Sequence, residues 1–235
     1  MLSRARAGLR ALVERWALPQ RCLFCGDFGH ADGICAGCRG DLPGSTAARC
    51  PVCANLSAQR QVCGECLAQA PDFSRVSVAV SYLFPVDAAI QRLKYGGDLA
   101  VVAPLAALLA ERVREEPPPD LVLALPMAPP RLRERGFNQA SELASALSMR
   151  LGVTLAPDLC RRTRHTPPQA ALPWGERHRN IRGAFEYTGD LAGARVAVVD
   201  DVLTTGATLN ELARVLLRAG AGEVVGWVVA RAERP

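Results

Sequence analysis

The 235-residue sequence contains few aromatic residues and almost no lysine. Aromatics make up 5% of the chain, and Lys94 is the one lysine among 28 basic residues. We interpret the arginine excess as a compositional bias rather than as a functional signal. Because aromatics are scarce, few side chains are available to stack on nucleic-acid bases. A hydrophobic content of 49% is enough for a buried core.

Long hydrophobic runs are also missing. No stretch of about 18 uncharged apolar residues occurs, so the sequence predicts no transmembrane helix. Charged residues interrupt the N-terminal segment, which therefore lacks the apolar core of a signal peptide. We expect an amphipathic helix over residues 1–18 that packs on its own chain, with membrane or partner contact as the alternative. The expected compartment is the cytoplasm, where thiols stay reduced.

Cysteine, in contrast, is abundant and regularly spaced. Eight of the nine cysteines form two copies of C-x2-C-x9-C-x2-C, offset by 28 residues. A C-x-x-C turn places two thiolates on one side of a tight loop, so two turns supply a closed tetrahedral zinc site. The predicted ligands are Cys22, Cys25, Cys35 and Cys38 in the first repeat and Cys50, Cys53, Cys63 and Cys66 in the second.

These repeats predict a double zinc ribbon over residues 19–70. The segment has few large apolar residues, so metal ligation must supply its stability. Disulfide bonds or a redox C-x-x-C are the alternatives, and a reducing compartment favours zinc over both. We expect each repeat to bind its own zinc, with a cross-braced pairing as the alternative. Cys160 stands apart from the repeats, and we expect it to be structural or incidental.

From residue 71 onward, apolar strands alternate with helical patterns. The expected strands are 75–83, 121–125, 194–199 and 223–229, and the expected helices are 86–93, 101–113, 140–151 and 207–219. This order predicts an α/β domain over residues 71–235, with a parallel sheet flanked by helices. Ligands of such sheets bind beyond the carboxyl ends of the strands.

The run VAVVDDVLTTGAT, residues 196–208, leads from a buried strand into a helix. Asp200 and Asp201 come at the carboxyl end of that strand, where they can accept hydrogen bonds from ribose hydroxyls. Backbone N–H groups and threonine hydroxyls then form an anion cradle at the helix N-terminus. Its residues are Thr204, Thr205, Gly206, Ala207 and Thr208. A capped strand-to-helix turn is the alternative, and the missing lysine excludes a nucleotide P-loop.

A second anion site is expected after the strand at 121–125, where the sequence reads MAPPRLRERGFNQA. We expect an arginine-rich loop that clamps a diphosphate, with a solvated helix start capped by Asn138 as the alternative. The candidate ligand residues are Arg131, Arg133, Arg135, Gly136, Phe137, Asn138 and Gln139. Lys94 either reaches a phosphate or is a surface lysine near a helix end.

Positive charge is concentrated in residues 127–183, which carry ten arginines and four acids. Within them, the proline-containing stretch RRTRHTPPQ at 161–169 is expected to be mobile. It is interpreted as a lid over a substrate, as a strip that binds single-stranded nucleic acid or as a solvated surface. His165 and His178 are weaker candidates for acid–base groups.

Taken in order, the tandem C-x-x-C pairs, LKYGG, RGFNQ and DDVLTTGAT resemble the ComF family of competence-associated phosphoribosyltransferase-like proteins. The resemblance covers about residues 19–231. It implies a double zinc ribbon followed by a type I phosphoribosyltransferase fold that binds phosphoribosyl diphosphate (PRPP) with magnesium. By the same resemblance, the two acids hold the ribose 2- and 3-hydroxyls, and the TTGAT stretch holds the 5-phosphate.

The resemblance also implies a role in DNA uptake and natural transformation, with single-stranded DNA and competence proteins as partners. One hypothesis is an enzyme that transfers ribose 5-phosphate from PRPP to an unknown acceptor. Asp200 and Asp201 would orient the ribose, and Arg135 would hold the diphosphate together with Arg131 and Lys94. The alternative is a non-catalytic module that binds single-stranded DNA and protein through the zinc ribbons and a basic loop.

Overall fold

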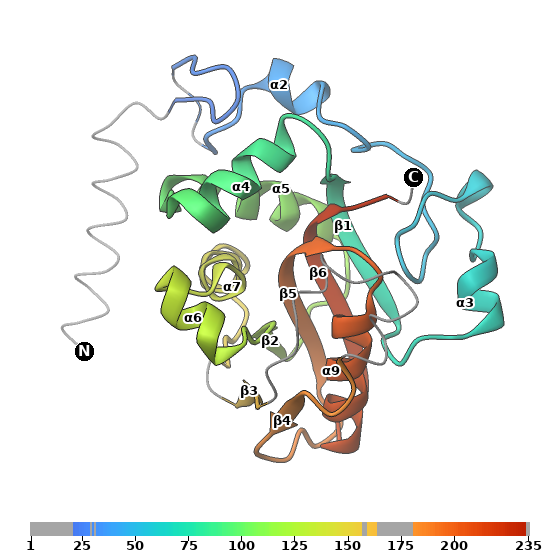
Figure 1. Ribbon diagram of the computed structural model, residues 1–235. Coiled ribbons are helices and arrows are strands. Elements are labelled where there is room, and N and C mark those ends of the chain that lie inside the picture. The colour runs from blue at the N-terminus through green and yellow to red at the C-terminus, as the bar shows by residue number, and fades with distance from the viewer. Residues whose placement is uncertain (1–20, 29, 31, 157–158, 164–180, 234–235) are drawn as a thin grey trace. The chain divides into compact units, whose positions relative to one another are not determined.

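The computed structural model describes residues 21–28, 30, 32–156, 159–163 and 181–233 (Figure 1). The helix expected over residues 1–18 and most of the basic stretch 161–169 lie outside this described part. The chain divides into two compact units, residues 1–42 and 43–235. The first cysteine repeat belongs to the smaller unit, and the second repeat belongs to the larger one.

The two cysteine repeats share one knuckle geometry. In the first, Arg21 donates to the Gly26 carbonyl at 3.3 Å, and Gly26 has a left-handed φ of 76°. In the second, Arg49 donates to the Ala54 carbonyl at 3.0 Å, and Ala54 has a φ of 58°. The 28-residue repeat therefore extends from the cysteines to the arginine that holds each turn. Short helices follow: α2 (Ala36–Gly40), η1 (Ala58–Arg60) and α3 (Gly64–Ala68).

The larger unit is built on a parallel four-stranded sheet in the order β1-β6-β5-β2. The strands are β1 (Arg75–Ser81), β2 (Leu121–Ala124), β5 (Arg195–Leu203) and β6 (Glu223–Arg231). The two central strands stay paired to their ends, where Leu203 lies opposite Arg231. A separate antiparallel pair consists of β3 (Cys160–Arg162) and β4 (Phe185–Tyr187).

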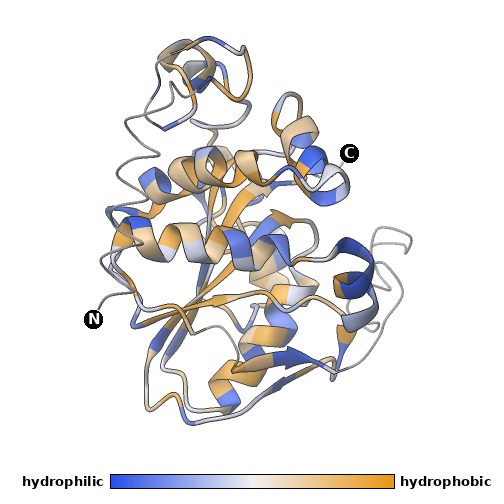
Figure 2. Cartoon of the chain, turned by 90° about the vertical axis from the view of Figure 1, so that its left-hand side faces the viewer, coloured by the Kyte–Doolittle hydropathy of each residue, from blue (hydrophilic) through white to orange (hydrophobic). Residues whose placement is uncertain are grey.

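Helices cover both faces of the sheet. The helices described in this unit after the cysteine repeat are α4 (Val86–Gly96), η2 (Leu99–Val101), α5 (Val102–Val113), α6 (Pro129–Arg135), α7 (Gln139–Leu151) and α9 (Ala207–Arg218). Helices α5 and α7 pack on one side, and α9 packs on the other (Figure 1). Along β5 alternate side chains face α9, and Val196 and Val198 join its leucines in one buried cluster. Figure 2 shows hydrophobic and hydrophilic residues side by side along these helices, as expected for one buried and one exposed face.

One glycine of the sheet is required by this packing. A Cβ at Gly226, in the middle of β6, would lie 2.6 Å from Leu209 of α9. The missing side chain therefore lets the first turns of α9 approach the sheet closely. This approach fixes where the N-terminus of α9 stands relative to the end of β5.

The α/β fold expected from the alternating pattern is confirmed, and each expected strand and helix is present within a few residues of its bounds. Three differences affect the site. Strand β5 continues to Leu203, so both aspartates lie within it rather than after it. Residues 129–135 form the helix α6, not the expected loop. The pair of β3 and β4 was not predicted.

Candidate functional site

The carboxyl end of β5 carries an ion pair. Asp201, whose side chain is 3% exposed, lies 2.9 Å from the ammonium of Lys94, whose side chain is 19% exposed. Desolvation lowers the pKa of Lys94, but the carboxylates of Asp201 and Asp200 more than offset it, so the pKa is raised. Lys94 is therefore a charged group aimed into the protein from the last turn of α4. This largely buried contact does not fit a surface lysine, and because Lys94 also lines a cavity with Arg131, its expected role as a phosphate ligand stays a prediction.

Asp200, the neighbouring residue of β5, is held in a less favourable environment. Burial and the adjacent Asp201 carboxylate raise its pKa well above the ordinary value. Its Oδ1 accepts a hydrogen bond from the backbone N–H of Asp201 at 2.9 Å. A carboxylate kept partly desolvated beside a like charge is a strong hydrogen-bond acceptor for a ligand hydroxyl.

The loop after β5 forms a cradle at the N-terminus of α9. Gly206 adopts a left-handed φ of 79° as the N-cap, a conformation that favours glycine. The Thr205 hydroxyl accepts from the backbone N–H of Ala207 at 3.2 Å, which tightens the turn. The first helical turn leaves N–H groups without intrahelical partners, and they point out of the helix end. The cavity against this loop has a volume of about 100 Å³ and is lined by Asp200, Thr204, Gly206 and Thr208, among others.

A second cavity of about 170 Å³ continues from the first. Both are lined by Asp200 and Thr208, so they form one elongated site. The second cavity adds charged and polar groups from four parts of the fold. They are Lys94 of α4, Arg131 of α6, Asn138 and Gln139 at the start of α7, and Arg162 of β3. The site thus runs from a loop of N–H and hydroxyl donors, past two carboxylates, to a group of cations.

The three candidate arginines of α6 do not all line the cavities. Arg131 and Arg135 are four residues apart and share a helix face, and both line a further cavity with Lys94 and Phe137. Arg133 is exposed and is not among the residues that line these three cavities. Arg135 also donates to Gln139 Oε1 at 2.7 Å, so it is held in place by a neighbour.

Two residues of the RGFNQ segment shape the backbone. Gly136 ends α6 in a left-handed conformation, and its N–H donates to Leu132 O at 2.8 Å. Asn138 caps α7 by accepting from Ala140 N at 3.2 Å, and its amide donates to Leu125 O at 3.0 Å. The alternative interpretation of Asn138 as an N-cap is therefore confirmed. Asn138 also ties the start of α7 to the segment after β2.

The thiols of each repeat gather into one cluster. Cys22, Cys25, Cys35 and Cys38 form one, Cys50, Cys53, Cys63 and Cys66 form the other, and within each all sulfur atoms lie within 4.8 Å of one another. Sequential pairing is therefore confirmed over the cross-braced alternative. The sulfur–sulfur distances of 3.7 Å between Cys25 and Cys35 and 3.5 Å between Cys53 and Cys63 fit the edge of about 3.8 Å of a tetrahedron with Zn–S bonds of about 2.3 Å.

Backbone N–H groups lower the pKa of one thiol in each cluster. Burial raises the pKa of Cys22, but N–H groups of Cys25 and Cys35 more than offset it and lower the pKa to about 6. The same opposition lowers the pKa of Cys50 to about 7. A lowered pKa favours the thiolate, which is the form of cysteine that binds zinc. Cys160, in contrast, is buried in the core, where desolvation raises its pKa to about 12 and leaves it a structural thiol.

Comparison with known proteins places the chain among relatives. The family model of the double zinc ribbon domain matches residues 13–67, and that of the phosphoribosyl transferase domain matches residues 132–234. "Competence protein F" of Haemophilus influenzae is 32% identical over 227 residues, which are 90% of this chain and 97% of that protein. The chain belongs to the competence protein F (ComF) family.

Other ComF-related proteins match over similar lengths. "DNA utilization protein YhgH" of Escherichia coli K12 is 32% identical and covers 91% of this chain and 98% of that protein. "Competence protein ComFC" of Streptococcus pneumoniae is 25% identical and covers 84% and 87%, respectively. Among solved structures, a purine phosphoribosyltransferase from Pyrococcus horikoshii shares 24% identity, covers 53% of this chain and 68% of that chain, and has a TM-score of 0.35.

For this ComF-family chain, the expected combination of a double zinc ribbon and a phosphoribosyltransferase-type domain is confirmed. No helix in the described ranges has the length and apolarity to cross a membrane.

Arg162 lines the site, although the sequence pattern placed it in the basic stretch 161–169 and not among the anion ligands. The sequence places it in one basic strip with Arg161 and Arg164, but of the two arginines that the structure describes, Arg162 lines the site and Arg161 is exposed. Desolvation and the nearby Arg131 charge lower the pKa of Arg162, as expected where two guanidiniums approach a common anion position. Strand alternation in β3 is the signal that separates the neighbours. Arg164, His165 and His178 lie outside the described residues.

Proposed function

We propose that this chain binds PRPP, or a ligand with a ribose 5-phosphate group, along the elongated site at the carboxyl edge of the sheet. One observation carries the proposal: the donor loop, the two aspartates and the cations line connected cavities in that order. PRPP has the matching order of a phosphate, a pair of ribose hydroxyls and a diphosphate. Phosphate at the N-terminus of α9 also gains from the helix dipole.

In this proposal each part of the ligand has its partners. Residues 204–208 hold the 5-phosphate, and Asp200 and Asp201 accept the ribose hydroxyls. Lys94 and Arg131 attract the diphosphate, with Arg162 as an addition to the residues expected from the sequence. Arg135 supports this end through its contact with Gln139. Magnesium bound with the diphosphate would neutralise part of its charge.

Transfer would replace the bond between ribose C1 and diphosphate with a bond between C1 and an acceptor. Negative charge builds up on the leaving diphosphate and positive charge on the sugar ring, so the cations at one end of the site and the carboxylates at its centre favour that step. The acceptor is not specified by the residues of the site. The proposed class is a phosphoribosyltransferase, and binding of PRPP is the part that the geometry supports most directly.

We further propose that the protein acts in DNA uptake, because its relatives are named competence and DNA utilization proteins. A cytoplasmic location is proposed with it, since two clusters of four thiols require reduced cysteines. Competence proteins and single-stranded DNA are the proposed partners. Exposed Arg133 and Arg161 are available for a strand, while Arg162 is engaged at the phosphoribosyl site.

Titration calorimetry with PRPP and magnesium tests the proposed function. Wild-type protein should bind PRPP, and Asp201→Asn should weaken binding by at least about tenfold, because a charge-assisted hydrogen bond contributes about 1.5–3 kcal/mol. Asp190→Asn is the matched control, since this exposed aspartate lies away from the site. No PRPP binding by the wild type would refute the proposal. DNA binding that falls steeply with salt and ignores Asp201→Asn would favour the DNA-binding module instead.

A further inference from the structure

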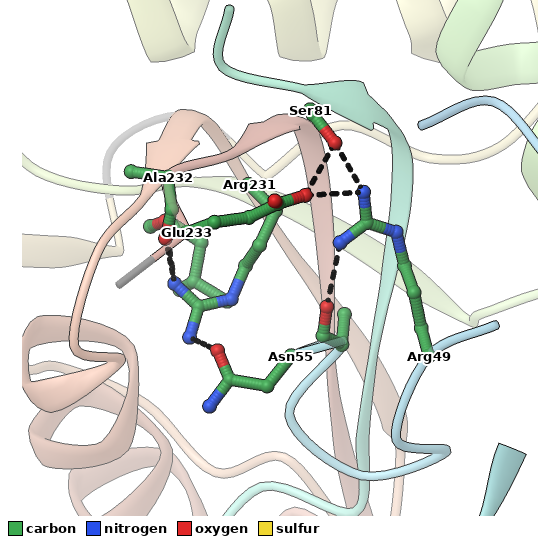
Figure 3. A network of polar contacts seen from close by, with 8 residues as sticks. Arg49, Asn55, Ser81, Arg231, Ala232 and Glu233 are labelled. Atoms are coloured by element: carbon green, nitrogen blue, oxygen red, sulfur yellow. Dashed lines mark hydrogen bonds and ion pairs between the residues drawn. The ribbon is translucent and has the colours of Figure 1, made fainter. Parts of the chain in front are cut away.

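A buried arginine connects the second zinc ribbon to the cradle of residues 204–208, which we call the phosphate loop. Arg231, the last residue of β6, is 2% exposed. Its Nη1 donates to the carbonyl oxygens of Leu203, at 2.8 Å, and Thr204. Its Nη2 donates to the side-chain oxygen of Asn55, as Figure 3 shows. One guanidinium therefore holds the start of the phosphate loop and a residue of the second knuckle at the same time.

The loop end of this link is specific. Leu203 is the last residue of β5, and Thr204 is the first residue of the cradle. The backbone N–H of Ala232 also donates to Leu203 O at 2.9 Å. Two carbonyls that point toward Arg231 fix the orientation of the peptide groups from which the loop departs. The following N–H groups, which would face a phosphate, take their direction from these peptides.

The ribbon end of the link lies in the segment between two cysteines of the second cluster. Asn55 lies between Cys53 and Cys63, and its backbone oxygen accepts from Cys50 N at 2.7 Å. The turn before it contains Ala54 in a left-handed conformation, which is a strained one for a residue with a Cβ. Ligation of a metal by the cysteines would hold this turn closed and keep the Asn55 side chain in place.

A second clamp keeps the knuckle against the sheet. Arg49 donates to Ala54 O at 3.0 Å. It also donates to Ser81 Oγ at 2.7 Å and to Glu233 Oε1 at 3.3 Å (Figure 3). The ribbon is thus anchored at the ends of β1 and β6, and the network reaches the phosphate loop through Arg231. In the first repeat the position of Asn55 is occupied by Asp27, so this amide is a feature of the second repeat.

We propose that Arg231 is a positioning residue that couples the second zinc cluster to the phosphate loop. Zinc in this cluster orders the loop and strengthens binding of a phosphoribosyl ligand. By thermodynamic reciprocity, bound ligand raises the affinity of the same cluster for zinc. The ordering of the loop stands on the contacts alone, whereas the effect on ligand affinity rests on the proposed function.

Hydrogen exchange in the full-length, zinc-loaded protein tests the ordering without any ligand. Asn55→Ala removes the amide but leaves the donations from Arg231 to the loop carbonyls. Backbone amides of residues 203–210 should exchange at least about fivefold faster in this variant, the lower range of typical couplings. Glu65→Ala is the matched control, because it removes the other contact of Asn55, at 3.4 Å, and should leave exchange unchanged. Equal exchange in wild type and Asn55→Ala would overturn the coupling.

PRPP titration and zinc retention test the second half. Asn55→Ala should weaken PRPP binding by about fivefold or more, with affinity restored toward wild type in Asn55→Gln. In a background with Cys25→Ser, which disables the first cluster, PRPP should shift the equilibrium of zinc between protein and chelator toward the protein, and Asn55→Ala should abolish this shift. Wild-type binding that Asn55→Ala leaves intact overturns this inference alone. Absence of binding in the wild type refutes the proposed function, and the exchange measurement then still decides the coupling.

Discussion

At the scale of single residues, the two aspartates of β5 differ although they are adjacent. Asp201 is paired with Lys94, whereas Asp200 has a raised pKa because of burial and of the Asp201 charge. An acid whose pKa is raised by folding destabilises the folded state once the pH exceeds its unfolded pKa. The destabilisation grows with pH until the folded-state pKa is passed.

Replacement of Asp200 by Asn should therefore raise the Tm at neutral pH. The gain relative to wild type should increase as the pH is raised from about 4, the ordinary pKa of an aspartate, toward 8, because the unfavourable ionisation is removed. Calorimetric scans of the zinc-loaded protein across this range measure it. Asp190→Asn, at an exposed position, should show no such trend. A lower Tm for Asp200→Asn at every pH would contradict the assigned environment.

The Lys94–Asp201 pair predicts a non-additive mutant cycle. Lys94→Met and Asp201→Asn should each destabilise the fold by about 1–3 kcal/mol, since each leaves its buried partner unpaired. The double variant should cost less than the sum, with a coupling of about 1–2 kcal/mol. Urea unfolding of the four proteins measures the cycle. Additive costs would show that the 2.9 Å contact contributes no pair energy.

At the scale of elements, α6 sets which arginines reach the ligand. Arg131→Ala should weaken PRPP binding by about tenfold or more, whereas Arg133→Ala should change it by less than about twofold. The two residues stand on one short helix, but only Arg131 lines the site. Calorimetry of both variants at one salt concentration checks this. Equal losses would mean that net charge, rather than position, attracts the ligand.

The sequence predicts an element when the signals for that element lie within one short segment. The run from Val196 to Thr208 is predictable because an apolar strand, two acids and a small-residue turn are contiguous. Helix α6 is not, because arginines at alternate positions do not mark one helix face, and its N-terminal prolines resemble a loop signal. Arg162 could not be assigned from a run of like charges, since strand alternation decides which neighbour faces the site.

Lys94 and Arg231 each contact a residue that is far away in the sequence. Lys94 meets Asp201 across more than a hundred residues, and Arg231 meets Asn55 over a separation of 176. No periodicity or spacing in the chain encodes such pairs, which depend on the order of strands in the sheet. The fold class and the phosphate loop were thus predictable, while the polar contacts beneath the loop required the structure.

At the scale of the whole molecule, the two cysteine clusters predict two bound zinc ions per chain. Native mass spectrometry should detect two equivalents, and Cys66→Ser and Cys38→Ser should each remove one. Acidification should release both, because zinc must compete with protons for the thiolates. A folded wild-type protein without metal would contradict the interpretation of both clusters.

The most direct measurement is a crystal structure of the full chain with PRPP and magnesium. We expect the 5-phosphate against residues 204–208, the ribose hydroxyls at Asp200 and Asp201, and the diphosphate toward Lys94 and Arg131. A phosphoribosyl ligand found away from the carboxyl edge of the sheet, or in the reverse orientation along the site, would contradict this prediction.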